Sequence, residues 1–542
     1  MEYADLLLIG GVVYTADPQL SWADSVAVRG RRIAAVGRSA DLLALRGPQT
    51  EVVELAGRAV VPGFTESHLH LVDLAMRAQQ VEATGSRSAS EVVERLARRM
   101  HGTDMAGWVR GGGWDANIWS DGLLPHKSLL DSVSGDVPVA LDSKDLHSMW
   151  VNSAALSCAG VTETSPDVPG GVIERDSDGK PSGVLRDTAV QLIQKAIPAI
   201  DLETAANAVH AAIPRLWSTG IVAVHNASDT VDGLALRTFQ WLRDQGLLGV
   251  RVLQQLPAAN LARAVGLGLR SGFGDAWLRI GGIKIFADGA LGSRTANMLE
   301  GYLGEPTNLG VAATEPDLLM RQGLEAVAAG LSLSVHAIGD RAVRNALDVF
   351  TEIRRRDSPS EGHGQRRLRH RIEHVQCMSD EDLPRLAALG VFASVQPIHC
   401  TSDIDLVERH WGEPRARAAY RFRDLLDSGA QLVFGSDGPI EPHAPLLGIH
   451  AAVTRRRLNG DPGPEGWQGG QRIRVDEALD AYTRWPAYLA GDECQRGTIT
   501  PGKLADLVVL AEDIFAVAPM EICHTPVDLT VLDGQAVWRR RD

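Results

Sequence analysis

Five residues with metal-binding side chains follow or end short apolar runs of the chain: His68, His70, His336, His374 and Asp437. Residues two apart on a β-strand point to the same side, so His68 and His70 could bind one ion together. Imidazole nitrogens with one carboxylate suit zinc and its neighbours better than Mg²⁺ or Ca²⁺. The pattern predicts a site for one or two divalent transition-metal ions, most simply zinc, whose chemistry would be the activation of water.

Two further histidines, His225 and His399, end other apolar runs. At such positions an imidazole could bind a substrate carbonyl or its tetrahedral oxyanion, or it could be structural. Trp114 could form a wall of a substrate pocket, although a tryptophan is more often part of a core.

The segment after Lys284 contains an acid and a base, Asp288 and Arg294. The arginine could bind an anionic group of a substrate, but we expect it to form an ion pair with Asp288. Both residues are therefore candidates for substrate contact, and the alternative is that they only stabilise the loop through their ion pair.

Candidate strands carry these residues and alternate with helical patterns along the chain. Eight apolar runs qualify: VVPGFTESH, GIVAVHN, VRVLQQL, RIGGIKIFAD, LSLSVHAIG, RHRIEHVQ, VFASVQP and QLVFGSD. Strands that alternate with helices are typical of a parallel α/β sheet. Eight of them favour a (β/α)8 TIM barrel, in which functional residues gather at the C-terminal face.

The barrel is predicted to comprise residues 62–75 and 201–485. Residues 76–200 separate the first two strands and are too many for one crossover, so they predict an inserted cap subdomain at the barrel rim. The β-rich ends, 1–61 and 486–542, each have too few strands to bury a sheet face alone. We therefore expect them to pair into one composite β-sandwich.

Composition excludes several functions. The net charge of -14, without a long Lys/Arg run, argues against a nucleic-acid partner. The apolar runs are shorter than the roughly 18 residues that a membrane span needs. The beginning of the chain does not resemble a secretion signal, and the five scattered cysteines are expected to be reduced. We expect a cytoplasmic protein with a small-molecule substrate, and a homodimer stays open.

Several motifs resemble the amidohydrolase superfamily, in the branch that contains N-substituted formamide deformylases (amidohydrolase family 3). In the predicted barrel these are VPGFTESHLH, KIFADGALGSRTA, HAIGDRA, RIEHVQ and FGSDGP. The insertion adds GGGWD, SKDLHSMWVNSAAL and PGGVIERDSDGKPSGVL, and the C-terminal part adds GTITPGKLADLVVL. The resemblance covers nearly the whole chain. It departs at His225, which is followed by Asn226 where members often have aspartate.

The resemblance implies a binuclear centre. Its first ion would be held by His68, His70 and Asp437, and its second by His336 and His374. Lys284 would lie between the ions, after reaction with CO2 to a carbamate whose two oxygens can bridge two cations. Alternatively, Lys284 is an ordinary lysine paired with Asp288 or Asp437, and the site holds one metal.

A hydrolytic mechanism follows from this centre. Metal coordination lowers the pKa of water from ~16 toward ~7, so hydroxide can attack a carbonyl at neutral pH. Asp437 would take the proton of the nucleophile and pass it to the departing nitrogen. The expected substrate is an N-substituted formamide or a related N-acyl amine. Two alternatives remain, a hydrolase or deaminase of a cyclic amide or amidine, and a non-catalytic scaffold of the same fold.

Overall fold

The computed structural model describes residues 3–101, 107–120, 123–143, 148–168, 170–227, 229–356 and 367–541. Residues 144–147 of the SKDLHSMW motif lie outside this range. The chain divides into two compact units, one of Met1–Leu74 with Ala205–Asp542 and one of Ala75–Thr204. Among the described residues, no helix is both long and apolar enough to cross a membrane.

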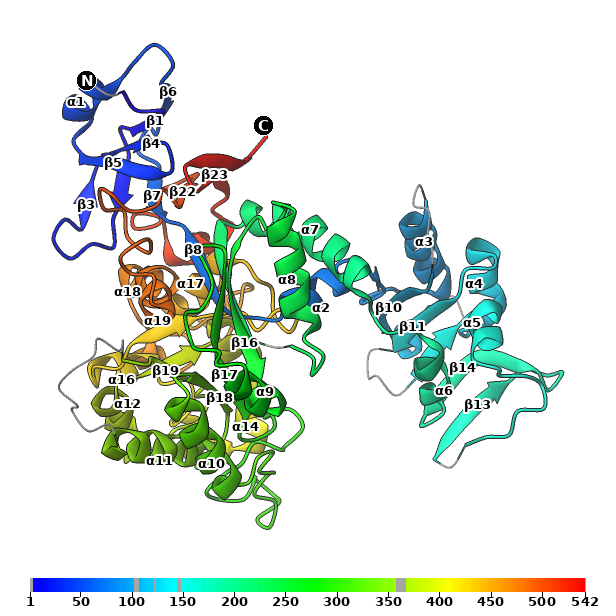
Figure 1. The fold of residues 1–542 in the computed structure, drawn as a ribbon. Coiled ribbons are helices and arrows are strands. Elements are labelled where there is room, and N and C mark those ends of the chain that lie inside the picture. Colours follow the sequence, from blue (N-terminus) through cyan, green and yellow to red (C-terminus); the bar gives the residue numbers. More distant parts are fainter. Residues whose placement is uncertain are drawn as a thin grey trace. The chain divides into compact units, whose positions relative to one another are not determined.

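The first unit contains a parallel barrel (Figure 1). Its described residues form eight parallel strands that neighbour one another in chain order. They are β8 (Phe64–Leu69), β15 (Ile221–Asn226), β16 (Arg251–Pro257), β17 (Leu278–Phe286), β18 (Ser332–Ala337), β19 (His370–His374), β20 (Val391–Val395) and β21 (Leu432–Phe434). Each lies within one of the eight runs identified in the sequence or extends past its end by one residue. The predicted α/β barrel is therefore confirmed.

Hydrogen bonds between the first strand and the segment after the last strand close one edge of the barrel. The amide of Asp437 donates to the carbonyl of His68 at 2.8 Å, and the amide of His70 donates to the carbonyl of Gly438 at 2.9 Å. Gly435 permits this approach, because a Cβ there would lie 2.5 Å from the backbone nitrogen of His68. The barrel thus closes at the C-terminal edge, where the candidate ligands lie.

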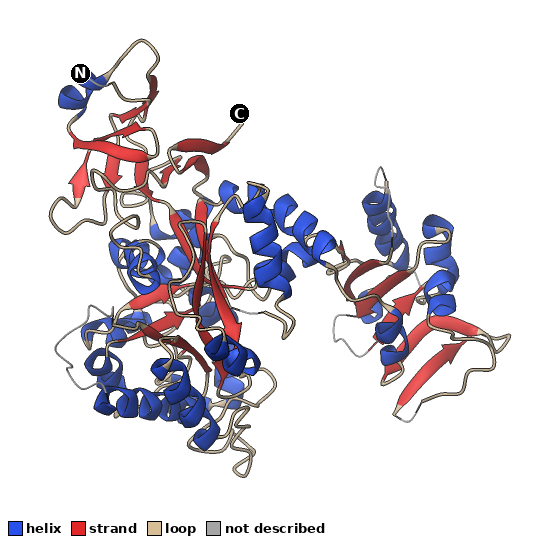
Figure 2. Ribbon diagram, in the orientation of Figure 1, coloured by secondary structure: helices blue, strands red, loops and turns tan. Residues whose placement is uncertain are grey.

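Helices flank the barrel strands (Figure 2). The crossovers contain α7 (Leu202–Ser218), α8 (Leu234–Asp244), α9 (Leu261–Gly266), α10 (Pro316–Ala328), α11 (Asp340–Arg356), α12 (Leu383–Leu389), α13 (Pro397–Ser402), α14 (Ile404–His410), α15 (Gly412–Ala416) and α16 (Phe422–Asp427). After β21 come α17 (Pro445–Thr454), α18 (Val475–Tyr482) and α19 (Arg484–Ala490). In α11, Val343, Ala346, Leu347 and Phe350 are buried at helical spacing, so this stripe faces the sheet.

Strands from both chain ends share one sheet. Its order is β24 (Gln535–Arg539), β23 (Val527–Leu532), β22 (Leu507–Leu510), β7 (Ala59–Pro62), β2 (Val12–Tyr14) and β3 (Trp22–Ala23). A four-stranded sheet has the order β5 (Arg32–Gly37), β4 (Ser25–Arg29), β1 (Leu6–Ile9) and β6 (Glu51–Glu54). Apolar side chains from strands of both sheets belong to one buried cluster.

The second unit has its own mixed sheet and core. The strand order is β13 (Gly171–Arg175), β14 (Pro181–Asp187), β12 (Ser148–Val151), β11 (Val139–Ser143), β10 (Val109–Trp114) and β9 (Val81–Glu82). Its longer helices are α3 (Ala89–Met100) and α4 (Lys127–Ser134). The Trp114 indole is buried against Trp150 and donates to the carbonyl of Leu141 at 2.8 Å. These contacts are those of a core residue and give no support to Trp114 as a pocket wall.

Candidate metal centre

His68, His70 and Asp437 converge at the closed edge of the barrel. Nε2 of His70 lies 2.9 Å from Oδ1 of Asp437, and Nε2 of His68 lies 3.2 Å from the same oxygen. One potential ligand atom from each residue lies within 4.8 Å of the others. Burial alone would raise the pKa of Asp437, but the nearby imidazoles hold it well below its usual range. The carboxylate is therefore ionised and suited to bind a cation.

A second donor group shares Asp437 and contains His374 and His399. Backbone φ angles of 76° at His374 and 59° at Asp437 place both residues in the left-handed region. Such strain in residues other than glycine is typical of functional sites. Nδ1 of His374 lies 2.8 Å from Oε1 of Gln396, which fixes the ring and leaves its Nε2 for a ligand.

His336 lies next to His374, as expected for a second ligand pair. Its ring centroid is 4.5 Å from that of His374, but its Nε2 lies 2.9 Å from the carbonyl oxygen of Gly289. The donor group with His374 and Asp437 contains His399 in place of His336. His399, expected only as a substrate contact, is thus also a candidate ligand, because one of its ring nitrogens lies within 4.8 Å of ligand atoms of His374 and Asp437.

Lys284 is buried beside both groups, with 3% of its surface exposed. Its Nζ has no hydrogen-bond partner among the described residues. Burial lowers the pKa of Lys284 to about 8, although the charges of Glu373 and Asp437 oppose this change. A pairing with Asp288 is not found, since that carboxylate accepts the amides of other residues. A buried amine without a partner is an incomplete arrangement that a bridging modification or an ion would satisfy.

Glu373, which was not among the predicted site residues, orients His68. Its Oε2 lies 2.6 Å from Nδ1 of His68, and its Oε1 lies 2.7 Å from Nε of Arg371. Burial would raise the pKa of Glu373, but Arg371, His68 and Lys284 hold it well below its usual range. The signal in the sequence was an arginine and a glutamate inside the short strand HRIEH, which is buried throughout.

His225 lies inside the barrel and contacts the same arginine. Its Nδ1 is 3.2 Å from Nη1 of Arg371. Since a guanidinium can only donate, Nδ1 accepts and Nε2 carries the proton. Burial, together with the charge of Arg371, holds the pKa of His225 well below its usual range. The neutral ring is therefore a hydrogen-bond donor whose Nε2 has no acceptor among the residues described.

The expected ion pair between Asp288 and Arg294 is wrong. Asp288 is buried and accepts the backbone amides of Asn297, Ile338 and Gly339. Arg294 instead pairs with Glu305 in the same long loop. Asp288 therefore anchors this loop to the end of β18, and the three amide bonds replace the cation that we expected.

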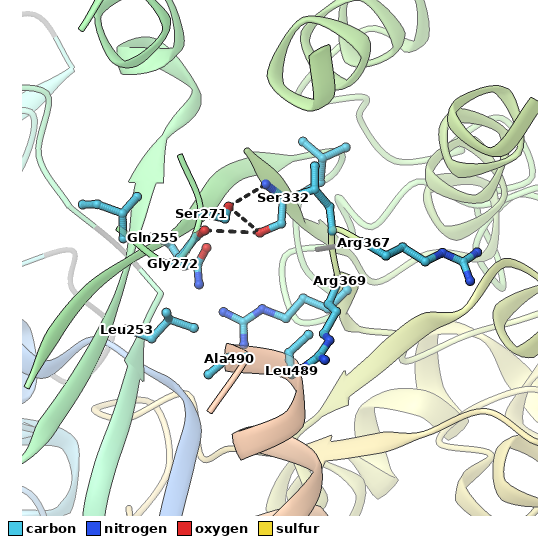
Figure 3. A pocket seen from close by; sticks show the side chains of 15 residues that line it. Leu253, Gln255, Ser271, Gly272, Ser332, Arg367, Arg369, Leu489 and Ala490 are labelled. Carbon is cyan, nitrogen blue, oxygen red and sulfur yellow. Dashed lines mark hydrogen bonds between the residues drawn. The ribbon is translucent and has the colours of Figure 1, made fainter. Parts of the chain in front are cut away.

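A cavity of about 100 Å³ lies at the opposite mouth of the barrel (Figure 3). It is lined by residues of β16, β17 and β18, including Leu253, Gln255 and Ser332. Arg369, which also lines it, is paired with Glu493 through both guanidinium ends. The N-terminal mouth of such barrels serves stability rather than chemistry, so this cavity is not a candidate active site.

The fold and the histidine–carboxylate groups at its C-terminal edge define a class, the barrel hydrolases that depend on metal. The chain belongs to the amidohydrolase family, whose model matches residues 51–538. It is 34% identical to the protein LONG AFTER FAR-RED 3 of Arabidopsis thaliana over 94% of this chain and 87% of that protein. It is 28% identical to an N-substituted formamide deformylase of Arthrobacter pascens over 99% of both chains.

A solved structure agrees with this assignment. An uncharacterized metal-dependent hydrolase from Pyrococcus furiosus is 30% identical, has a TM-score of 0.76, and covers 94% of this chain and 99% of its own. The protein is thus a metal-dependent hydrolase that acts on carbon–nitrogen bonds. The donor atoms described above fit such a metal, because they combine imidazole nitrogens with one ionised carboxylate.

Proposed function

We propose that the protein hydrolyses the amide bond of an N-substituted formamide or a related N-acyl amine, with two divalent transition-metal ions, zinc being the expected one. The observation that carries this proposal is the pair of donor groups that share Asp437 beside the unpartnered amine of Lys284. The deformylase relative supports the substrate class. The five free cysteines support the accompanying proposal of a cytoplasmic location.

In this proposal His68, His70 and Asp437 would hold one ion. His374 would hold the other, with His336 or His399 as its second imidazole. Lys284 would supply a bridging carbamate, formed when its neutral amine adds CO2 and releases one proton. A pKa of about 8 supports this step, because a fraction of the amine is then neutral near pH 7.

Bound ions of this kind acidify water and polarise a carbonyl oxygen. Asp437 accepts the proton of the attacking water and delivers it to the departing nitrogen, since an amine leaves poorly unless it is protonated. Glu373 keeps the proton of His68 on Nδ1, so that Nε2 remains a ligand. The neutral His225 is a candidate donor to the oxyanion, as is His399 if His336 is the ligand.

The test is a comparison of substrates on a preparation of known metal content. Formate release from N-formyl amines should exceed acid release from the acetyl and benzoyl analogues, because a formyl carbon is little hindered. Ring opening of hydantoins and lactams is measured in parallel. Preferential ring opening, or release of ammonia from a cyclic amidine, would replace the formamide with the cyclic substrate class. An active preparation without metal would contradict the whole proposal.

A further inference from the structure

An exposed aromatic ring lies beside the candidate metal centre. Phe286 ends β17, two residues after Lys284, so both side chains project from the same side of the strand. In the strand pairing, Phe286 lies opposite His336 of β18. Its ring centroid is 5.1 Å from that of His336 and 5.2 Å from Nζ of Lys284. The ring therefore borders the centre on the side where the strand ends.

Burial changes sharply along this face of the strand. Lys284 is 3% exposed, whereas Phe286 is 47% exposed. The ring contacts polar groups below it and leaves about half of its surface open to water. A half-exposed ring in this position can contact a bound substrate, and such a contact would remove apolar surface from water. The position of the ring thus indicates an apolar wall at the entrance to the candidate centre.

The loop beside the end of β17 contributes a second apolar side chain. The amide of Ala313 donates to the carbonyl of Ala287 at 3.0 Å, and Asp288 forms a bridge with Ala312. Val311, in the same segment, is 52% exposed. Val311 therefore adds an exposed apolar side chain to the loop that pairs with the residues after β17.

We propose that Phe286 forms the wall that receives the hydrocarbon substituent on the substrate nitrogen, and so selects N-substituents with aromatic or branched groups. This inference rests on the proposed function. The acyl side of a formamide carries only hydrogen, so the nitrogen substituent is the one part of the substrate that can cover the ring. Stacking on Phe286 would also hold the amide carbonyl above the ligands of the centre.

The experiment compares two substrates that differ only in a phenyl group, N-(2-phenylethyl)formamide and N-ethylformamide. In Phe286→Ala, kcat/KM for the phenylethyl substrate should fall by about 10- to 100-fold, and for the ethyl substrate by less than about 3-fold. Phe286→Leu should lie between wild type and Phe286→Ala. The matched control is Phe273→Ala. Phe273 is 66% exposed, and its carbonyl accepts the amide of Ile280 near the start of β17, at the other mouth of the barrel.

A second measurement is independent of turnover. Inhibition by 2-phenylethylamine relative to ethylamine should weaken in Phe286→Ala and stay unchanged in Phe273→Ala, with equal metal content in all variants. An equal fall for both substrates, or none, would overturn the role of Phe286 while leaving the proposed function intact. If the wild type releases formate from neither compound, the formamide is ruled out as the substrate of the proposed function. The same phenylethyl and ethyl pair, made with whichever acyl group is cleaved, then decides the role of Phe286.

Discussion

Oε2 of Glu373 lies 2.6 Å from Nδ1 of His68. Glu373 lies on β19 and His68 on β8, and these two strands are not neighbours in the barrel sheet. The contact crosses the interior of the barrel, and Arg371 fixes the other carboxylate oxygen. His374, the next residue after Glu373, belongs to the candidate ligands. One short strand therefore provides both a ligand and the residue that orients a ligand on β8.

Replacement of this carboxylate should weaken metal binding. Glu373→Gln keeps the shape of the side chain but removes its charge, so we expect a 10- to 100-fold loss of metal affinity. Competition with a chelator, followed by elemental analysis, measures the change. Glu493→Gln is the control, since Glu493 pairs with Arg369 at the other mouth of the barrel. Equal affinity in Glu373→Gln and wild type would show that His68 needs no such partner.

Asp437→Asn should fold normally and lose the chemistry, because the amide is nearly isosteric but cannot accept a proton. We expect kcat to fall by at least ~100-fold, the lower end of what acid and base groups contribute. Circular dichroism checks the fold. A variant with a native spectrum, full metal content and near-normal kcat would remove Asp437 from the proposed mechanism.

Lys284→Ala should reduce the metal content from two ions per chain toward one and abolish most activity, because the bridging group is lost. Elemental analysis and kcat of the same preparation provide the measurement. Addition of acetate or propionate, which offer two oxygens to the vacated space, should partly restore both values. Full activity without added carboxylate would mean that Lys284 is structural.

Asp480 of α18 should make stability depend on pH. Burial raises its pKa to about 6, although Arg484 and the hydroxyl of Tyr14, 2.8 Å away, oppose the change. Because the folded pKa is above the unfolded value of about 3.9, the carboxyl stabilises the fold below pH ~4. That contribution is lost as the pH rises through 6.

Asp480→Asn stays neutral at every pH. Its Tm minus that of wild type should therefore increase between pH 4 and 6 and level off near pH 7. Thermal unfolding at pH 4, 5, 6 and 7 tests this, with Asp427→Asn, which removes an exposed carboxylate of α16, as the control. A difference that is constant with pH, or that decreases, would contradict the assignment.

The barrel could be predicted because each strand is an apolar run between helical patterns. The spacing of apolar residues that distinguishes strands from helices is a local property of the sequence. The pairing of His68 with His70 at one oxygen is equally local, since residues two apart share a strand face. The grouping of Asp437 with them came from the resemblance to the amidohydrolase superfamily, and the closed barrel brings the first strand beside the segment after the last strand.

Contacts decided by loop conformation could not be predicted. Arg294 and Asp288 are close in sequence, but the loop turns the arginine toward Glu305 and leaves Asp288 to backbone amides. The choice between His336 and His399 depends on the position of the Gly289 carbonyl, which no pattern of residue types encodes. Glu373 was overlooked because its partner lies on a distant strand.

The hydrogen bonds between β8 and the segment after β21 have a consequence for when the metal site can form during synthesis of the chain. His70 and Asp437 are 367 positions apart, and the hydrogen bonds that close the barrel lie at the same place as their side chains. A ribosome releases the two histidines of the first strand long before the aspartate. A polypeptide that ends before Asp437 would lack the carboxylate that both donor groups share, and its barrel would have an open edge. The full set of ligands can therefore bind metal only after Asp437 has been synthesised. A chain that ends before this residue would be inactive rather than partly active.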